Sequence, residues 1–262
     1  MRMAPRSPLS HRRESVLLWL WGLVLMLLPG PYAKAASDYA KGASEKGAYP
    51  WHKNIVTTVF WIGQGRTPIS AATNVASAWD VHWTRNYGGL DDPNRRVGFL
   101  PRRFAVTLNP FYVALPFNDV AYPDLARRWV PWYREPSRAN RYVSQCKGHW
   151  VQIRHKGRVA YAQWEDVGPL RADFPSYVFG TDRPRGYNGA GLDVSPAVRD
   201  YLGLHGLDLT DWRFVSEEDV PPGPWMKYGE QAILLRAILN EERRAAAQAS
   251  SMLAPALFPG RR

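Results

Sequence analysis

Residues 150–169 read WVQIRHKGRVAYAQWEDVGP, and this stretch decides the fold. Two sets of side chains alternate along Trp150–His155, which is the period of a strand with two different faces. The pair Lys156-Gly157 is typical of a two-residue turn. A second alternation runs along Arg158–Trp164 before Gly168-Pro169 breaks the strand. The stretch therefore predicts a β-hairpin, from which the other elements can be placed.

A second clear signal follows the hairpin, in the run GLDVSPA at residues 191–197. Ser195 directly before Pro196 is typical of a helix N-cap with proline at the first helical position. This part of the chain predicts a strand that leads into a helix over Ala197–Leu204, and a closing strand at Trp212–Val215.

Upstream of the hairpin the pattern is less regular. Runs of β-branched, aromatic and other apolar residues predict short strands at Thr57–Ile62, Phe104–Thr107 and Phe111–Leu115. Glycine, proline and arginine clusters predict a long exposed loop over residues 84–103. Three prolines within residues 121–142 predict a second irregular excursion.

The start of the chain has the parts of a secretory signal. Several arginines precede the apolar run Val16–Leu28, and an A-x-A site follows at residues 33–35. We expect residues 1–35 to be a signal peptide, which places the protein in the periplasm or outside the cell. After cleavage we expect no membrane span in the mature protein. The alternative is that the apolar run stays uncleaved and serves as a membrane anchor.

Composition bounds the remaining organisation. The chain has 262 residues, 22 prolines, 21 glycines and a formal net charge of +11. We expect a flexible lead-in over 36–50, a mainly β domain over 51–220 and a helical extension over 221–262. An amphipathic helix within the extension, at 228–249, either packs on this domain or contacts a partner. The basic charge indicates anionic surroundings or a surface kept soluble by charge. Export argues against nucleic acid, and the oligomeric state is left open.

The order of these motifs resembles that of the double-psi β-barrel proteins, which include rare lipoprotein A-type lytic transglycosylases, expansins and family-45 endoglucanases. Residues 164–169 are similar to that family's strand ending in N-D-x-G-P, and residues 191–197 to its I-D-L-S-x-A step. The resemblance implies a mainly β protein. Its centre would be a six-stranded double-psi β-barrel with long loop insertions and one short helix, followed by a C-terminal helix.

Two departures limit what the resemblance implies about activity. Rare lipoprotein A-type enzymes carry a glutamate in G-E-x-[FY]-[DN], whereas the comparable residues 74–80 contain none. Expansins carry a histidine where this chain has Gly191. The fold expectation survives both departures, but the specific activity does not transfer directly.

The resemblance implies that Asp193 faces a groove and that Asp166 lies on a neighbouring strand. Cleavage of a glycosidic bond needs a protonated carboxyl beside the leaving oxygen, so we expect Asp193 to be the acid and Asp166 to assist it. Structural alternatives are open for both. Asp166 stands before a Gly-Pro turn, where aspartate often binds backbone amides, and Asp193 could assist the helix start beside Ser195.

Aromatic and acidic neighbours supply candidate sugar-binding residues, because aromatic rings pack well on the C–H faces of sugars. The candidates are Asp80, Asp119, Trp79, Trp83, Trp164 and Tyr177. The alternative is that the two aspartates support loops and that the rings belong to the core.

Other chemistries find little support. His82, His149 and His155 lack the spacing of a metal site, and the run Gly63-Gln64-Gly65 lacks the lysine and helix of a phosphate loop. Cys146 has no evident base in the sequence. We therefore expect no metal and no cofactor.

Three functions remain in competition. The first is an exported enzyme that cleaves peptidoglycan or another β-linked polysaccharide, as a lytic transglycosylase or an endoglycosidase. The second is a non-catalytic, expansin-like module that binds or loosens a cell-wall glycan. The third is a structural envelope protein whose barrel supports the loops.

Overall fold

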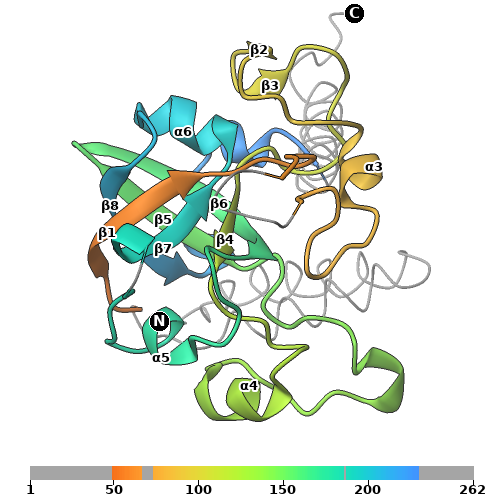
Figure 1. Cartoon of the computed structure of the whole chain (residues 1–262), viewed down its shortest axis with the longest axis vertical. Coiled ribbons are helices and arrows are strands. Elements are labelled where there is room, and N and C mark those ends of the chain that lie inside the picture. The colour runs from red at the N-terminus through yellow and green to blue at the C-terminus, as the bar shows by residue number, and fades with distance from the viewer. Residues whose placement is uncertain (1–48, 67–72, 186, 230–262) are drawn as a thin grey trace, which may run out of the picture. The chain divides into compact units, whose positions relative to one another are not determined.

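The computed structural model describes residues 49–66, 73–185 and 187–229 (Figure 1). The expected signal peptide over residues 1–35 lies outside the described residues, as do nearly all of the lead-in and of the helix expected at 228–249. Within the described ranges, no helix is both long enough and apolar enough to cross a bilayer.

Six strands close into a barrel in the order β1-β7-β4-β6-β5-β8. They are β1 (His52–Val59), β4 (Tyr112–Leu115), β5 (Trp150–His155), β6 (Arg158–Val167), β7 (Ala190–Val194) and β8 (Asp208–Val215). Two pairs are parallel, β1 with β7 and β4 with β6, and β7 joins the two pairs by running antiparallel to β4. The predicted mainly β fold with a six-stranded barrel is confirmed.

The predicted hairpin forms β5 and β6. Lys156 and Gly157 both have positive φ angles, of 44° and 81°, as the two central residues of a type I′ turn require. The strands pair in register from Trp150–Gln163 to His155–Arg158.

The predicted strand-to-helix step is also present. The Ser195 hydroxyl accepts a hydrogen bond from the Val198 amide at 3.2 Å, and α6 (Pro196–Leu202) ends at Gly203, whose φ of 71° is left-handed. Helix α6 packs against β6. The N-cap thus fixes where the chain leaves β7, directly after the residues that form the candidate site.

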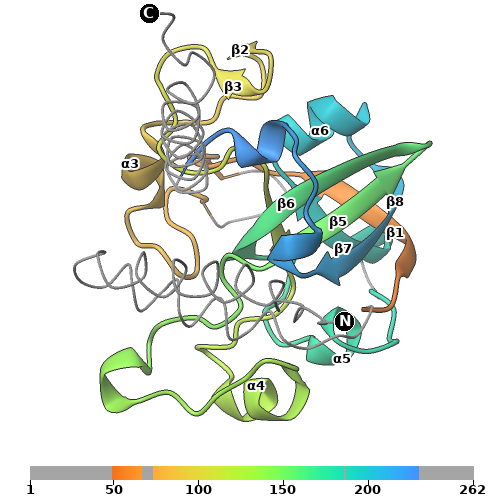
Figure 2. The same ribbon diagram turned by 180° about the vertical axis from the view of Figure 1, so that it is seen from behind.

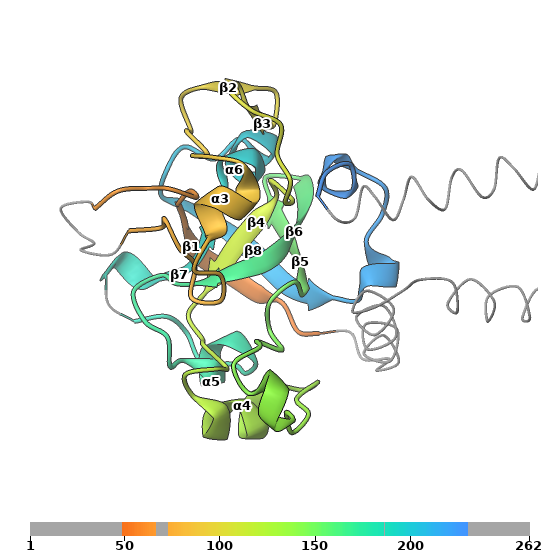
Figure 3. The same ribbon diagram turned by 90° about the vertical axis from the view of Figure 1, so that its right-hand side faces the viewer.

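Strand β4 is buried on both of its faces. Val113 and Leu115 belong to the main core inside the barrel. Tyr112 and Ala114 face a second apolar cluster that includes Trp83 of α3 (Trp83–Tyr87), and Figure 3 shows α3 over β4. The segment before β4 therefore forms a cover over the outer face of this strand.

Three predictions for the segments between the barrel strands are wrong in detail: one strand and two irregular loops. Phe104–Thr107 is not a strand, because its apolar side chains pack on the second cluster and Thr107 donates to the Tyr87 carbonyl. The exposed loop expected over 84–103 contains most of α3 and the small hairpin of β2 (Arg96–Val97) and β3 (Leu100–Pro101).

The excursion expected over 121–142 likewise contains the helix α4 (Pro123–Trp129) and a 3₁₀ turn, η1 (Arg138–Asn140). Pro123 stands in the first turn of α4, where a missing N–H costs nothing. Strand β1 begins at His52, five residues before the predicted start.

The connecting segments extend from two ends of the barrel. Figures 1 and 3 show the β2–β3 hairpin at one end, and α4 and α5 (Pro175–Val178) at the other. Figure 2 shows the face of the barrel that carries β5 and β6. The short turn η4 (Pro224–Met226) contacts β6, where the Trp225 and Tyr161 ring centroids are 5.1 Å apart. The other short turns are η2 (Tyr187–Gly189) and η3 (Glu217–Asp219).

Candidate functional site

The two acids expected to act together lie in one cross-strand row. Thr58 of β1 pairs with Asp193 of β7, Asp193 pairs with Ala114 of β4, and Ala114 pairs with Asp166 of β6. Register partners on neighbouring strands present their side chains on the same face of a sheet. The barrel therefore brings the predicted acids together from strands that are far apart in the sequence.

A register shift between β4 and β6 turns Asp166 toward this row. Val113 pairs with Trp164, but Ala114 pairs with Asp166, so Glu165 is the extra residue. Without the shift, Glu165 would stand beside Ala114. Trp164 points into the main core, whereas Asp166 meets the cover segment on the outer side of β4, where its Oδ1 accepts a hydrogen bond from the Ala78 amide at 2.8 Å.

Asp193 has a different set of neighbours. Its Oδ1 accepts a hydrogen bond from the Thr58 hydroxyl, and its Oδ2 lies close to Gly168. A Cβ added at Gly168 would stand 3.3 Å from this oxygen and 3.7 Å from the Ala114 Cβ. The small residues Ala114 and Gly168 thus leave space around the second oxygen of the carboxyl.

Both carboxyls hold their protons more tightly than ordinary aspartates. Burial raises the pKa of Asp166 to about 6, and its residue is only 6% exposed. Burial, followed by the negative charge of Asp166, raises the pKa of Asp193 to about 7. Near neutral pH, Asp166 is therefore mostly a carboxylate while Asp193 still carries a proton in about half of the molecules. This is the division of labour that an acid and its charged partner need.

Trp79 is the predicted aromatic residue that combines partial exposure with a position beside the acid pair. It follows Ala78, which binds Asp166, and its indole N–H donates to the Asn118 side chain at 3.2 Å. Its ring packs edge-on against Trp164 with centroids 5.4 Å apart. The ring is thus held firmly while part of it faces solvent.

The other three aromatic candidates lie in the core. Trp83 is 1% exposed, and Trp164 and Tyr177 are fully buried. Trp164 donates to the Asp166 carbonyl at 2.8 Å, so it supports the strand that carries the acid. Their ring faces are covered by neighbouring side chains, so we assign them to packing and not to sugar binding.

The two further aspartates are engaged in loops. Asp80 accepts hydrogen bonds from the His82 amide and from the Asn86 side chain. Asp119 is 5% exposed. Its carboxylate accepts hydrogen bonds from the Ser144 hydroxyl at 2.7 Å and from the backbone amides of Gln145 and Cys146. The hydrogen bonds of both carboxylates therefore stabilise the loops in which they lie.

Four residues of the site were not among the sequence candidates: Thr58, Ala78, Ala114 and Gly168. Thr58 and Ala114 enter through strand register, and Ala78 contributes only its backbone amide. Gly168 alone had a sequence signal, as part of the Gly-Pro break that ends β6.

Two depressions of the surface lie apart from the acid pair. The larger, of about 650 Å³, is lined by Phe99, Gly157, Arg158, Val159, Asp200 and Tyr201. The smaller, of about 130 Å³, is lined by Leu90, Asp92, Arg95, Pro101, Arg102, Arg103 and Phe104. The candidate site therefore rests on the geometry and acidity of the pair and not on the size of a cavity. Within the described ranges, no group of three or more His, Cys, Asp or Glu side chains is arranged to hold a metal ion.

No protein-family model matches the chain, and no curated protein sequence matches it. Among solved structures, the chain is similar to the Streptomyces papain inhibitor (SPI) at 15% identity and a TM-score of 0.28. The similarity covers 65% of this chain and 99% of the inhibitor. A score of this size carries no argument about function, so the site has to be interpreted from its own chemistry.

Proposed function

We propose that this protein is an exported enzyme that cleaves peptidoglycan or another β-linked polysaccharide, with Asp193 as its general acid and Asp166 assisting. The observation that supports the proposal is the pairing of two carboxyls on either side of Ala114. Their pKa values of about 6 and about 7 leave one charged and the other partly protonated.

The chemistry would begin with a proton transfer from Asp193 to the glycosidic oxygen, so that the leaving sugar departs as an alcohol. Positive charge then develops on the sugar ring, and the Asp166 carboxylate stabilises it. A hydroxyl of the same sugar, or a water molecule, closes the reaction by attacking the ring and returning its proton to Asp193. Attack by the sugar's own hydroxyl is the reaction of a lytic transglycosylase, and attack by water is that of a hydrolase.

The rest of the chain fits this role. The apolar run Val16–Leu28 with its A-x-A site suits export, and a basic protein is attracted to anionic cell-wall polymers. The motifs around Asp166 and Asp193 resemble those of the double-psi lytic transglycosylases and endoglucanases. Trp79 would supply the ring on which a sugar packs near the acids.

Digestion of purified sacculi, followed by mass spectrometry of the soluble fraction, tests the proposal. We expect fragments with anhydro ends or new reducing ends, at least a hundredfold fewer of them with Asp193→Asn, and an intermediate loss with Asp166→Asn. Asp124→Asn is the matched control, because this carboxylate is 90% exposed on α4. Activity that survives Asp193→Asn would contradict the assignment of the acid.

A non-catalytic glycan-binding module is the second candidate, and the burial of Asp166 against the Ala78 amide favours it. The same samples separate the two functions. Sedimentation with insoluble glycan without any released product would support binding alone, as in expansins. Neither binding nor release would support a structural envelope protein.

A further inference from the structure

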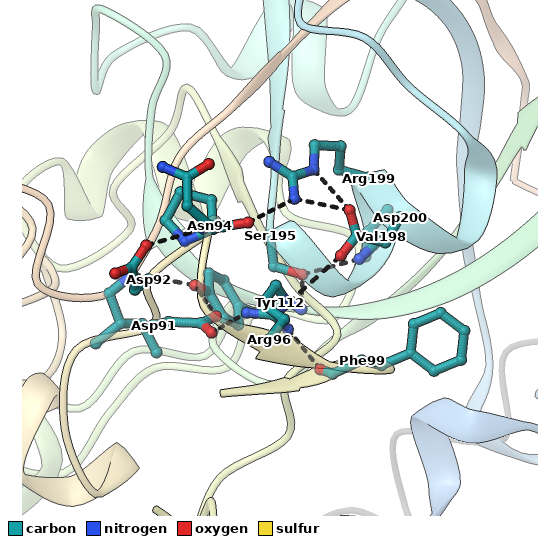
Figure 4. Close-up of polar contacts among 12 residues, drawn as sticks. Asp91, Asp92, Asn94, Arg96, Phe99, Tyr112, Ser195, Val198, Arg199 and Asp200 are labelled. Carbon is teal, nitrogen blue, oxygen red and sulfur yellow. Dashed lines mark hydrogen bonds and ion pairs between the residues drawn. The ribbon is translucent and has the colours of Figure 1, made fainter. Parts of the chain in front are cut away.

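Arg96 anchors the β2–β3 hairpin to the barrel through a buried network (Figure 4). Its side chain is 6% exposed, and its guanidinium donates to the Asp91 carboxylate and to the Phe99 carbonyl. Asp200 of α6 lies 3.5 Å from the Arg96 Nε. Asp91 also accepts from the Tyr112 hydroxyl at 2.8 Å, which ties the network to β4. The charge of Arg96 is thus balanced within the protein.

The backbone around Arg96 is held as firmly as its side chain. Arg96 pairs with Pro101 and Val97 with Leu100, and the Arg102 amide donates to the Arg95 carbonyl at 2.9 Å. In addition, the Arg199 side chain of α6 donates to the Pro93 carbonyl at 3.0 Å. The hairpin is therefore a fixed platform rather than a free loop.

Three other arginines of this platform have little to balance their charge. Arg95, Arg102 and Arg103 are exposed and line the depression of about 130 Å³. Arg95 lies 3.6 Å from Asp92, while within the described part of the chain no carboxylate lies within ion-pair distance of Arg102 or Arg103. The depression therefore holds three cations against one anion, beside apolar walls from Leu90 and Phe104.

We propose that this depression binds an anionic group, carboxylate or phosphate, of an acidic polysaccharide. Guanidinium groups present paired N–H donors that match the oxygens of both anions. Because the hairpin is already ordered, binding would cost little conformational entropy. The apolar walls suit the C–H face of a sugar next to the charged group. The inference deepens the proposed function by giving the glycan a negative charge, and it rests on that function for the choice of a polysaccharide.

The inference is tested by isothermal titration calorimetry with three dextrans that share the same sugar backbone. They are neutral dextran, carboxymethyl dextran and phosphorylated dextran. We expect both charged polymers to bind, with affinity falling as salt rises, and neutral dextran to bind at least tenfold more weakly. The tighter of the two charged polymers identifies the anion. Arg102→Gln/Arg103→Gln should weaken binding of that polymer at least tenfold.

The matched control is Arg138→Gln/Arg141→Gln, which removes the same charge from exposed positions at and beside η1. Its affinity should stay within twofold of the unmodified protein. An equal loss in both double variants would overturn the inference, since net charge alone would then explain binding. Equal affinity for neutral and charged dextran would also overturn it. Single-stranded DNA with the same number of negative charges serves as a fourth polymer, and tighter binding to DNA than to the charged dextrans would overturn the inference as well.

The test also separates this inference from the catalytic proposal. Asp193→Asn should bind the charged dextran as tightly as the unmodified protein while releasing at least a hundredfold fewer sacculus fragments. If the protein releases no fragments at all, the catalytic proposal fails, yet a specific loss in Arg102→Gln/Arg103→Gln still establishes the anion site.

Discussion

Asp166 and Asp193 lie on strands that do not pair with each other, yet both are register partners of Ala114. Two strand spacings separate their backbones, so their Cα atoms are about 9–10 Å apart. The methyl group of Ala114 is the only side chain between them in the row. The two carboxyls therefore flank one methyl group, and they are close enough for the charge of Asp166 to raise the pKa of Asp193.

The first prediction concerns the pH dependence of sacculus cleavage. The rate should rise as Asp166 ionises near pH 6 and fall as Asp193 loses its proton near pH 7, which gives a bell with its maximum between these values. Asp166→Asn removes a negative charge beside Asp193, so the pKa of Asp193 should fall and the alkaline limb should move to lower pH. An alkaline limb that stays in place would contradict the coupling.

Gly168→Ala should move the same limb in the opposite direction. The new methyl group would stand 3.3 Å from the Asp193 Oδ2 and would remove solvent from that oxygen. Loss of solvent disfavours the charged form, so the pKa of Asp193 should rise by about half a unit or more. Carbon-13 NMR titration of the carboxyl measures this without any need for activity. The control is Gly65→Ala, where no described atom lies within 4 Å of the new Cβ. A pKa that is unchanged or lowered would show that the oxygen does not face Gly168.

Asp193→Asn should stabilise the fold at alkaline pH. The pKa of Asp193 rises on folding from 3.8 to about 7, so the folded state binds more protons than the unfolded chain in this window. Stability from this group is full below about pH 4 and is lost as pH rises through 7. The variant escapes this loss and should gain about 2–4 kcal/mol at pH 8.

Urea unfolding at pH 8 and at pH 4 measures this difference, which should almost vanish at the lower pH. Asp124→Asn serves again as the control, because its side chain is 90% exposed. Lower stability of Asp193→Asn at pH 8 would mean that the charged carboxyl is well satisfied in the folded protein.

Tyr112→Phe should destabilise the hairpin anchor. The Tyr112 hydroxyl donates to Asp91 at 2.8 Å and accepts from the Ile62 amide at 3.0 Å, and the residue is fully buried. Its removal leaves the buried Ile62 amide without this partner and takes one hydrogen bond from the Asp91 carboxylate, which keeps Arg96, and the loss should cost about 1–3 kcal/mol. Urea unfolding provides the value. Tyr142→Phe is the control, since Tyr142 is 73% exposed. A cost below about 0.5 kcal/mol would contradict the role of the network.

The elements that could be predicted from the sequence are those with local causes. The turn Lys156-Gly157 depends on Gly157, which adopts a positive φ without steric cost, and the start of α6 depends on Ser195 and Pro196. Each signal lies within a few residues of the structure that it specifies. Pro123 favours irregular structure by its residue type, but it lies in the first turn of α4. Proline breaks the interior of a helix and yet suits its first turn, so the residue type alone does not decide between the two.

The candidate site depends on contacts that no local pattern contains. The register shift that selects Asp166 over Glu165 is a property of the pairing with β4, and the Ala78 amide reaches Asp166 from 88 positions away in the sequence. The aromatic candidates show the same limit. Trp79 and Trp164 both stand near acids in the sequence, but the barrel interior takes one and leaves the other partly exposed.

The row that joins Thr58 to Asp166 has a consequence for how the protein acquires reactivity. Four strands drawn from both halves of the chain must close before either carboxyl is sheltered from water. In the unfolded chain both groups are ordinary aspartates, which are ionised at neutral pH. Whatever proton chemistry the pair performs therefore depends on all four strands being paired.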